Sequence, residues 1–191
     1  SMAFLGKESL LQHTFKRSLG WVKKDNIYIG TTKRYLSNVK KQLPKFPENH
    51  ISIEPSLKER APAIGLAALI MNHHDRNSSF MCMWSDHFIK EQPGYFKNLL
   101  KQAEKFLNKH PEKTLTIGIT PTFAHTGLGY IQKGKIFKNQ DIPLFEVKGF
   151  KEKPDAELAK KFLANKNYLW NSGYFIWKTE TLLGLYKTHL P

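Results

Sequence analysis

Apolar residues recur along this chain at two alternating spacings, one typical of helices and the other of strands. Leu10, Leu11, Phe15 and Leu19 would share one face of a helix over residues 9–19. Similar patterns predict further helices at 32–43, 63–72, 95–108, 155–164 and 179–186. Short apolar and β-branched runs predict strands at 26–31, 51–53, 79–84, 114–120 and 173–177, and another just ahead of Glu152. This alternation favours an α/β fold in which helices cover a sheet on both faces.

Single residues refine the expected boundaries. Pro62 can occupy the first turn of its helix, where a backbone N–H is not needed. Asp155 and Thr179 stand where helix caps are expected. Residues 130–137 favour a hairpin that turns at Lys133 and Gly134. Asp86 and Glu54 follow predicted strands, at the carboxyl ends where open α/β sheets bind ligands.

The composition is that of an ordinary globular domain. At 191 residues, the chain is long enough for one domain with a substantial core. Its longest apolar run, residues 63–71, falls short of the ~20 residues that a membrane-spanning helix needs. Ser1 ahead of Met2 resembles the remnant of a cleaved tag, and residues 1–3 lack the layout of a signal peptide. We therefore expect the domain at 4–191, with no membrane contact.

Cys82 is the single cysteine of the chain. One cysteine excludes an internal disulfide and a cysteine-based zinc site, and it fits a reducing cytoplasm. Because it lies in an apolar run, Cys82 is expected to fill space in the core.

The net charge of +14 raises the possibility of nucleic-acid binding. Against this, the lysines are spread along the chain in pairs such as Lys23-Lys24 and Lys160-Lys161, without a long basic run. Lysines on solvated helix faces account for most of the charge. The rest of the positive charge would produce an electrostatic field that attracts anionic nucleotides and sugar phosphates. We therefore expect no nucleic-acid partner, although salt-dependent oligonucleotide binding would support one.

Two short blocks near the C-terminus carry the most chemistry. Phe150-Lys151-Glu152-Lys153-Pro154 places a carboxylate and an ammonium side by side after a strand, where the proline stops that strand. Trp170-Asn171-Ser172-Gly173 follows at a short distance and leads into another aromatic strand. A carboxylate accepts hydrogen bonds from vicinal hydroxyls, and an ammonium holds a phosphate. Together they suit a sugar-phosphate pocket.

These blocks resemble the F-x-E-K-P and W-N-S-G motifs of sugar nucleotidyltransferases, most closely the mannose-1-phosphate guanylyltransferase family. Three blocks further upstream also resemble motifs of this family, and they occur in the same order as in the family. Residues 53–64 resemble E-P-x-x-R-N-T-A-P-A-I, residues 84–89 resemble P-A-D-H-x-I, and residues 116–131 resemble T-x-G-I-x-P-T-x-x-x-T-G-Y-G-Y-I. The resemblance covers nearly all of residues 4–190 and implies a Rossmann-like, GT-A-like sheet.

The resemblance also implies roles for individual residues. Nucleotide-binding positions are Glu54, Pro55, Lys58, Ala61 and Pro62. Sugar-phosphate-binding positions are Gly127, Glu152, Lys153, Asn171 and Gly173. Asp86 matches the aspartate that binds Mg²⁺, and Asp86 and Lys153 are the implied catalytic residues. The implied partners are GTP and mannose 1-phosphate, which would give GDP-mannose and pyrophosphate.

The chain departs from the family pattern in two respects. Lys58, Glu59 and Arg60 replace the arginine, asparagine and threonine of the nucleotide block. The glycine-rich loop that opens the family, G-G-x-G-T-R-L-W-P-L-S-R, and a second metal-binding aspartate beyond the last helix have no counterpart, so the sequence resembles a piece cut at both ends. We therefore expect this chain alone to be inactive or nearly so, and an exposed sheet edge would permit a homodimer. A non-catalytic sugar-nucleotide-binding or regulatory homologue, or a transferase for another sugar 1-phosphate and nucleotide, remain the alternatives.

Overall fold

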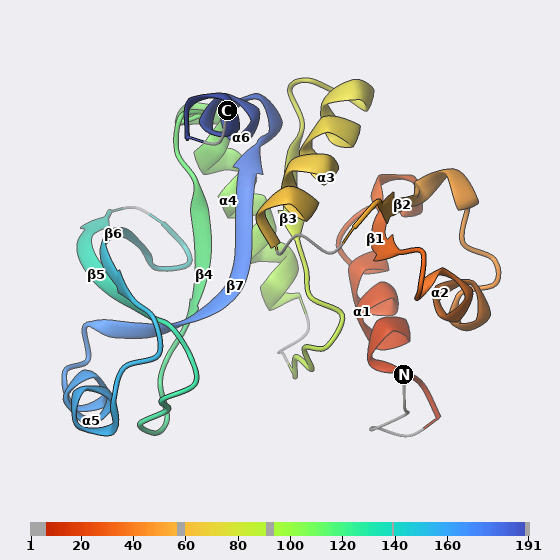
Figure 1. Ribbon diagram of the computed structural model, residues 1–191. Coiled ribbons are helices and arrows are strands. Elements are labelled where there is room, and N and C mark those ends of the chain that lie inside the picture. The colour runs from red at the N-terminus through yellow and green to blue at the C-terminus, as the bar shows by residue number, and fades with distance from the viewer. Residues whose placement is uncertain (1–6, 57–59, 91–93, 139, 190–191) are drawn as a thin grey trace. The chain divides into compact units, whose positions relative to one another are not determined.

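The computed structural model describes residues 7–56, 60–90, 94–138 and 140–189 and combines helices with strands (Figure 1). Its internal contacts divide the chain into two compact units. The first unit comprises residues 1–113 and 177–191, and the second comprises residues 114–176. The mixed α/β composition confirms the fold class expected from the alternating pattern.

The first unit holds most of the helices. Its α-helices are α1 (Leu10–Leu19), α2 (Leu36–Gln42), α3 (Arg60–His74), α4 (Tyr95–Lys109) and α6 (Thr179–His189). Short 3₁₀ turns η1 (Lys24–Asn26) and η2 (Glu48–His50) precede the strands β1 (Ile29–Thr32) and β2 (Ile51–Glu54), and β3 (Ser79–Cys82) follows α3. Strands β1 and β2 are parallel and pair from Ile29↔Ile51 to Thr32↔Glu54, which puts Glu54 at a carboxyl strand end.

Helices α3 and α6 pack closely because one position in α3 lacks a side chain. A Cβ atom at Gly65 would lie 2.9 Å from the Tyr186 ring, so the ring occupies the space that glycine leaves. The Tyr186 hydroxyl donates to the carbonyl of Ala61, in the first turn of α3. Desolvation, which is the largest cause, raises the pKa of Tyr186 above its ordinary value.

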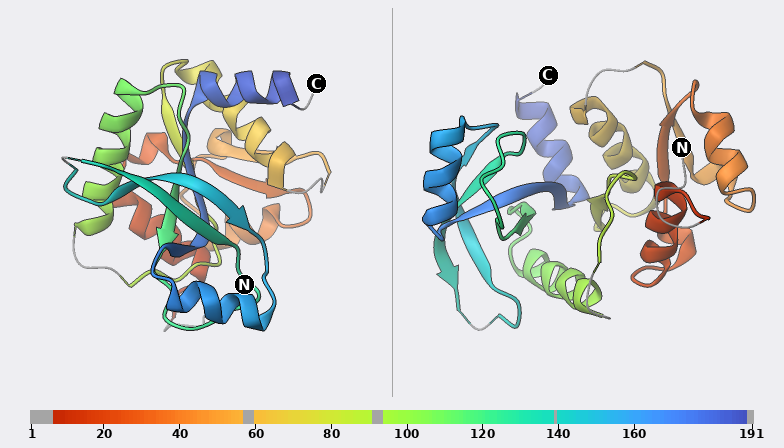
Figure 2. Two further views of the ribbon diagram at one scale, coloured as in Figure 1. Left: turned by 90° about the vertical axis from the view of Figure 1, so that its left-hand side faces the viewer. Right: turned by 90° about the horizontal axis from the view of Figure 1, so that it is seen from below.

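The second unit is a set of antiparallel strands with one helix. It contains β4 (Leu115–Ile119), β5 (Tyr130–Phe137), β6 (Leu144–Lys151), α5 (Ala156–Ala164) and most of β7 (Tyr168–Lys178). Within this unit, β5 pairs with both β6 and β7, and β4 also pairs with β7. Helix α5 packs against β5 and β7 through a core of Tyr130, Ala159, Phe162 and Trp170 (Figure 2).

The hairpin expected within residues 130–137 was wrong. These residues form one strand, β5, which pairs with β6 from Tyr130↔Lys151 to Phe137↔Leu144. Gly134 marks an irregular stretch of this ladder, where a Cβ atom would approach the Glu146 Cβ to 3.1 Å. An isolated glycine in a strand indicates close backbone approach as readily as a turn, and here it is the former.

Helix caps were predicted with mixed success. The Asp155 carboxylate accepts a hydrogen bond of 2.8 Å from the Leu158 backbone N–H, so Asp155 caps α5 as expected. Thr179 does not act as a cap, because α6 begins at this residue and its buried hydroxyl lies 3.0 Å from the Ser78 carbonyl. Among the described residues, no helix has both the length and the apolar character needed to cross a membrane.

The environment of Cys82, on β3, leads to a first prediction. Burial raises the pKa of this thiol from 9.0 to about 12. Because the thiolate is the reactive form, we expect a chromogenic disulfide reagent at pH 8 to modify folded protein at least about 100-fold more slowly than denatured protein. Because the thiol pKa is higher in the folded than in the unfolded chain, the contribution of Cys82 to the free energy of unfolding is constant below about pH 9. This contribution falls as the pH rises towards 12. Equal rates in the folded and denatured states would contradict this account.

Candidate active site

The carboxylate of Glu152 lies over the backbone of Gly129. Glu152 directly follows β6, and Gly129 directly precedes β5, whose first residue pairs with the last residue of β6. A Cβ atom placed on Gly129 would lie 2.5 Å from Glu152 Oε2 and 3.5 Å from the Asn171 Cβ. The absent side chain of Gly129 therefore leaves the space that the Glu152 carboxylate occupies, and Asn171 borders the same space.

Backbone and side-chain hydrogen bonds hold Asn171 in this arrangement. The Asn171 N–H donates to the Gly129 carbonyl at 2.8 Å. Its side-chain oxygen accepts from the Gly173 N–H at 3.0 Å and lies 3.5 Å from the Thr116 hydroxyl. Because Oδ1 is engaged as an acceptor, the orientation of the amide is set, and Nδ2 is the group that can donate to a ligand.

A bulge in β7 produces this geometry. Strand β4 pairs with β7 at Thr116↔Phe175 and next at Gly118↔Asn171, so β7 contains extra residues at this point. Gly173 has a φ of 75°, a left-handed conformation that glycine adopts without strain. The Ser172 hydroxyl donates to the Ile117 carbonyl at 2.6 Å and fixes the bulge to β4. Bulges of this kind commonly re-aim a side chain beside a functional site.

Lys153 is held in an unusual backbone conformation. Its φ is 41°, and it is the only described non-glycine residue with a positive φ. The neighbouring Pro154 is buried, and Asp155 caps α5, so the chain on the C-terminal side of Lys153 is fixed. The side chain of Lys153 is exposed. Strained backbone that persists between fixed neighbours is more frequent at functional sites.

This strain predicts a stability difference between two substitutions. Lys153→Gly should be at least as stable as Lys153→Ala, because a left-handed conformation costs a residue with a Cβ roughly 1–2 kcal/mol and costs glycine little. Both variants lose the ammonium equally, so any effect of charge cancels between them. Urea denaturation of the two variants measures the difference. An alanine variant clearly more stable than the glycine variant would show that the conformation carries no strain.

The last predicted sugar-phosphate residue, Gly127, lies in the loop between β4 and β5. Its N–H donates to His125 Nδ1 at 2.8 Å, and a Cβ atom would lie 2.9 Å from the imidazole ring. The buried Tyr130 hydroxyl holds the same loop by accepting from the His125 N–H at 3.1 Å and donating to its carbonyl at 2.9 Å. Gly127 thus shapes this loop, and none of these contacts brings it to Glu152.

The predicted nucleotide-binding residues lie in the first unit. Glu54 ends β2 and Pro55 follows it, while Ala61 and Pro62 belong to the first turn of α3. Lys58 lies outside the described residues. The guanidinium of Arg60 lies 5.9 Å from the centre of the Trp84 ring. Arg60, which replaces the threonine of the family pattern, therefore packs towards the segment that carries Asp86.

Asp86 occupies a turn just beyond β3, as predicted. Its side chain is 80% exposed, and its Oδ1 lies 3.9 Å from His87 Nε2. No group of three or more metal-ligating side chains occurs among the described residues. A lone exposed carboxylate still suits Mg²⁺, which keeps several waters and commonly takes one or two carboxylates together with substrate phosphates.

Sequence reasoning assigned no individual role to Gly129 or Thr116. Both fall within residues 116–131, where the resemblance to the family gave a role to Gly127 alone. The structure shows that the close approach at Gly129 is made by the Glu152 carboxylate of the protein itself. A contact between residues so far apart in the chain depends on strand pairing, which the pattern of a single sequence does not specify.

Comparisons with known proteins agree with this fold. A family model described as "Nucleotidyl transferase" matches residues 1–190. A mannose-1-phosphate guanylyltransferase of Klebsiella pneumoniae is 33% identical over 184 residues, which are 95% of this chain and 38% of that relative. One of Escherichia coli is 39% identical over 139 residues, which are 71% of this chain and 29% of the relative. The chain thus spans well under half the length of these curated relatives.

Two solved structures resemble the chain. The first structure, described as mannose-6-phosphate isomerase from Helicobacter pylori, has a TM-score of 0.79 at 25% identity. The match covers 98% of this chain and 68% of the Helicobacter chain. A second structure, described as mannose-1-phosphate geranyltransferase from Thermus thermophilus, has a TM-score of 0.76 at 22% identity. The match covers 95% of this chain and 51% of the Thermus chain. The latter likeness shows the fold alone.

The fold is therefore of the Rossmann-like, GT-A-like class, with the side chains of Glu152 and Asn171 close to a glycine at strand ends. The chain belongs to the nucleotidyl transferase family.

Proposed function

We propose that the whole protein transfers a guanylyl group from GTP to mannose 1-phosphate, and that the second unit supplies the sugar-phosphate pocket. The observation that carries this proposal is that the Glu152 carboxylate and Asn171 both lie within 3.5 Å of the position that a Cβ atom would take on Gly129. The names of the mannose-1-phosphate guanylyltransferase relatives support this choice of substrates.

Each polar group of the pocket suits one part of a sugar 1-phosphate. The Glu152 carboxylate accepts hydrogen bonds from two neighbouring hydroxyls of the ring. The Asn171 amide nitrogen donates to a ring substituent, since its oxygen is already engaged by the Gly173 N–H. The exposed Lys153 ammonium attracts the phosphate and keeps it beside the sugar-binding groups.

Positioning and charge stabilisation account for the proposed reaction. An oxygen of the sugar phosphate attacks the α-phosphorus of GTP, the bond from that phosphorus to the bridging oxygen breaks, and its electron pair leaves with pyrophosphate. Lys153 holds the attacking phosphate, so no covalent intermediate with the protein is required. The Asp86 carboxylate would hold Mg²⁺, which would supply positive charge near the phosphates.

A non-catalytic sugar-nucleotide-binding homologue is the second candidate. It is favoured by Lys58, Glu59 and Arg60, which replace the family residues where side chains would meet the nucleotide. Arg60 lies over Trp84. Such a protein would bind sugar phosphate or sugar nucleotide without forming pyrophosphate.

Thermal unfolding with a panel of ligands tests the proposal. The panel contains mannose 1-phosphate, glucose 1-phosphate, GDP-mannose, GTP and a short oligonucleotide, each with and without Mg²⁺. A ligand at about 100 times its Kd should stabilise the folded chain by about 2.7 kcal/mol. We expect selective stabilisation by mannose 1-phosphate or GDP-mannose. A flat response to both, or stabilisation by the oligonucleotide alone, would contradict the proposed pocket.

A further inference from the structure

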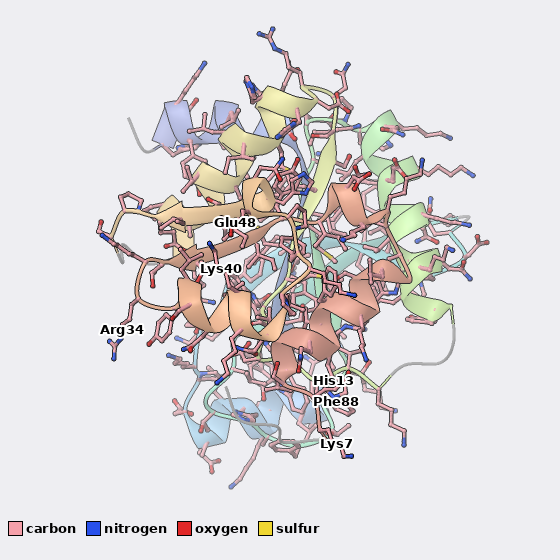
Figure 3. The ribbon with its side chains drawn as sticks, turned by 90° about the vertical axis from the view of Figure 1, so that its right-hand side faces the viewer. Lys7, His13, Arg34, Lys40, Glu48 and Phe88 are labelled. Carbon is pink, nitrogen blue, oxygen red and sulfur yellow. The ribbon has the colours of Figure 1, made fainter. Side chains whose placement is uncertain are left out.

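Helix α1 presents one face to the segment that carries Asp86. The ring of His13 packs edge-on against Phe88, with centroids 6.4 Å apart, and the two side chains lie together in Figure 3. One turn further along, an Arg17 nitrogen, Nη2, lies 3.5 Å from the His87 carbonyl oxygen. The Ser18 hydroxyl lies 3.7 Å from the Met83 sulfur. His13, Arg17 and Ser18 of α1 therefore contact residues on both sides of Asp86 in the sequence.

The N-terminal end of α1 is itself fixed. Ser9 and Gln12 form a capping box, in which each side chain bonds the backbone N–H of the other residue. Both side chains also bond Gln42 at the end of α2: the Ser9 hydroxyl donates to Gln42 Oε1 at 2.6 Å, and the Gln12 amide donates to the Gln42 carbonyl at 2.9 Å. A helix anchored in this way can serve as a rigid support.

The guanidinium of Arg17 is held from several sides. It donates to the Thr14 hydroxyl at 3.2 Å and lies 5.8 Å from the centre of the Trp21 ring. That ring stacks on Phe96 of α4, with centroids 4.1 Å apart and planes 11° from parallel. Its Nε is buried without a hydrogen-bond partner among the described residues, which also provide no carboxylate within ion-pair distance of Arg17.

This arrangement suits support of a loop better than binding of a ligand. The buried Nε does not face solvent, and Nη2 lies within reach of two acceptors at fixed positions. The acceptors here are Thr14, on the same helix, and the His87 carbonyl, next to Asp86. Residues 83–88 form no helix or strand, so contacts from α1 substitute for regular backbone pairing in holding them.

We propose that Arg17 is a positioning residue, which fixes the Asp86–His87 turn through the His87 carbonyl and so holds the Asp86 carboxylate ready for a divalent cation. The positioning rests on the contacts of α1. The purpose of the positioning rests on the function proposed above, in which Asp86 binds Mg²⁺.

Hydrogen–deuterium exchange in the whole 191-residue chain tests the positioning directly. Arg17→Met should speed exchange of the amides at 84–88 by at least about tenfold, because it opens the turn locally. Arg34→Met is the matched control, since Arg34 stacks on Tyr35 and makes none of the contacts to this turn. We expect less than about twofold change at 84–88 in the control.

A second variant keeps the test decisive if Arg17→Met unfolds. Thr14→Val removes one acceptor of the guanidinium while keeping size and charge, and it should give a smaller acceleration confined to the same amides. Unchanged exchange at 84–88 in Arg17→Met, or in Thr14→Val where Arg17→Met does not fold, would overturn the proposal.

Binding of Mn²⁺, a spectroscopic substitute for Mg²⁺, separates the two claims. Measured by water proton relaxation, Mn²⁺ affinity should fall in Asp86→Asn and, less strongly, in Arg17→Met, while Arg34→Met keeps the affinity of the unmodified chain. If Asp86→Asn leaves Mn²⁺ binding unchanged, the proposed metal role of Asp86 fails, and exchange still decides whether Arg17 positions the turn. If Asp86→Asn weakens binding and Arg17→Met does not, the proposed purpose of the positioning is wrong.

Discussion

Gly129→Ala should weaken binding of mannose 1-phosphate by about 10- to 100-fold. The new methyl group would lie 2.5 Å from Glu152 Oε2, a distance at which the carboxylate must move. Hydrogen bonds to charged groups contribute about 1.5–3 kcal/mol each, and every 1.4 kcal/mol is a factor of ten in affinity. Because the φ of Gly129 is not in the left-handed range, the substitution introduces no backbone strain of its own. Calorimetric titration measures the loss.

Gly149→Ala is the matched control for this prediction. Gly149 lies in β6 of the same sheet, and its added methyl group would come no closer than 3.8 Å to Gln132 Oε1, an ordinary contact. This variant should bind mannose 1-phosphate as the unmodified chain does. Equal affinities for the two alanine variants would mean that the position of Glu152 does not govern binding.

Gly173→Ala should lower the free energy of unfolding by about 1–3 kcal/mol and also disturb the pocket. At a φ of 75°, any residue with a Cβ is strained, and the bulge that aims Asn171 depends on this conformation. The Gly173 N–H also donates to Asn171 Oδ1, so a shift of the bulge turns the amide away from its set orientation. Chemical denaturation measures the first effect, and titration with mannose 1-phosphate measures the second.

Gly94→Ala separates backbone strain from damage to the pocket. Gly94 has a φ of 81°, and within the described part of the chain no atom lies within 4 Å of an added Cβ, so the expected effect of alanine there is backbone strain. We expect a similar loss of stability in both variants and a loss of binding only in Gly173→Ala. Unchanged binding in Gly173→Ala would remove Asn171 and its bulge from the account of sugar recognition.

The periodic segments of the fold could be predicted from the sequence. Helix α1 follows from the spacing of Leu10, Leu11, Phe15 and Leu19, and the N-terminal end of α5 from the cap at Asp155. The strand β5 was predicted wrongly, because Gly134 has the same local signal in a tight turn and in an irregular strand. Only the partner strand β6 distinguishes these cases, and pairing is a long-range property.

The sequence named candidate site residues one by one, but it could not predict their geometry. Resemblance selected Glu152 and Asn171, and the structure brings them together around Gly129. The conformation of Lys153 and the bulge beside Gly173 could not be predicted, because each arises from neighbours that the fold holds in place.

Calorimetric titration of the chain with mannose 1-phosphate, beside Glu152→Gln, tests the central claim most directly. Glutamine keeps the shape of the side chain and removes its charge, so the fold should be preserved while one oxygen acceptor becomes a donor. We predict saturable binding to the unmodified chain and a loss of at least about tenfold in affinity in Glu152→Gln. Equal binding by the two proteins would contradict the assignment of Glu152 as the group that recognises the sugar.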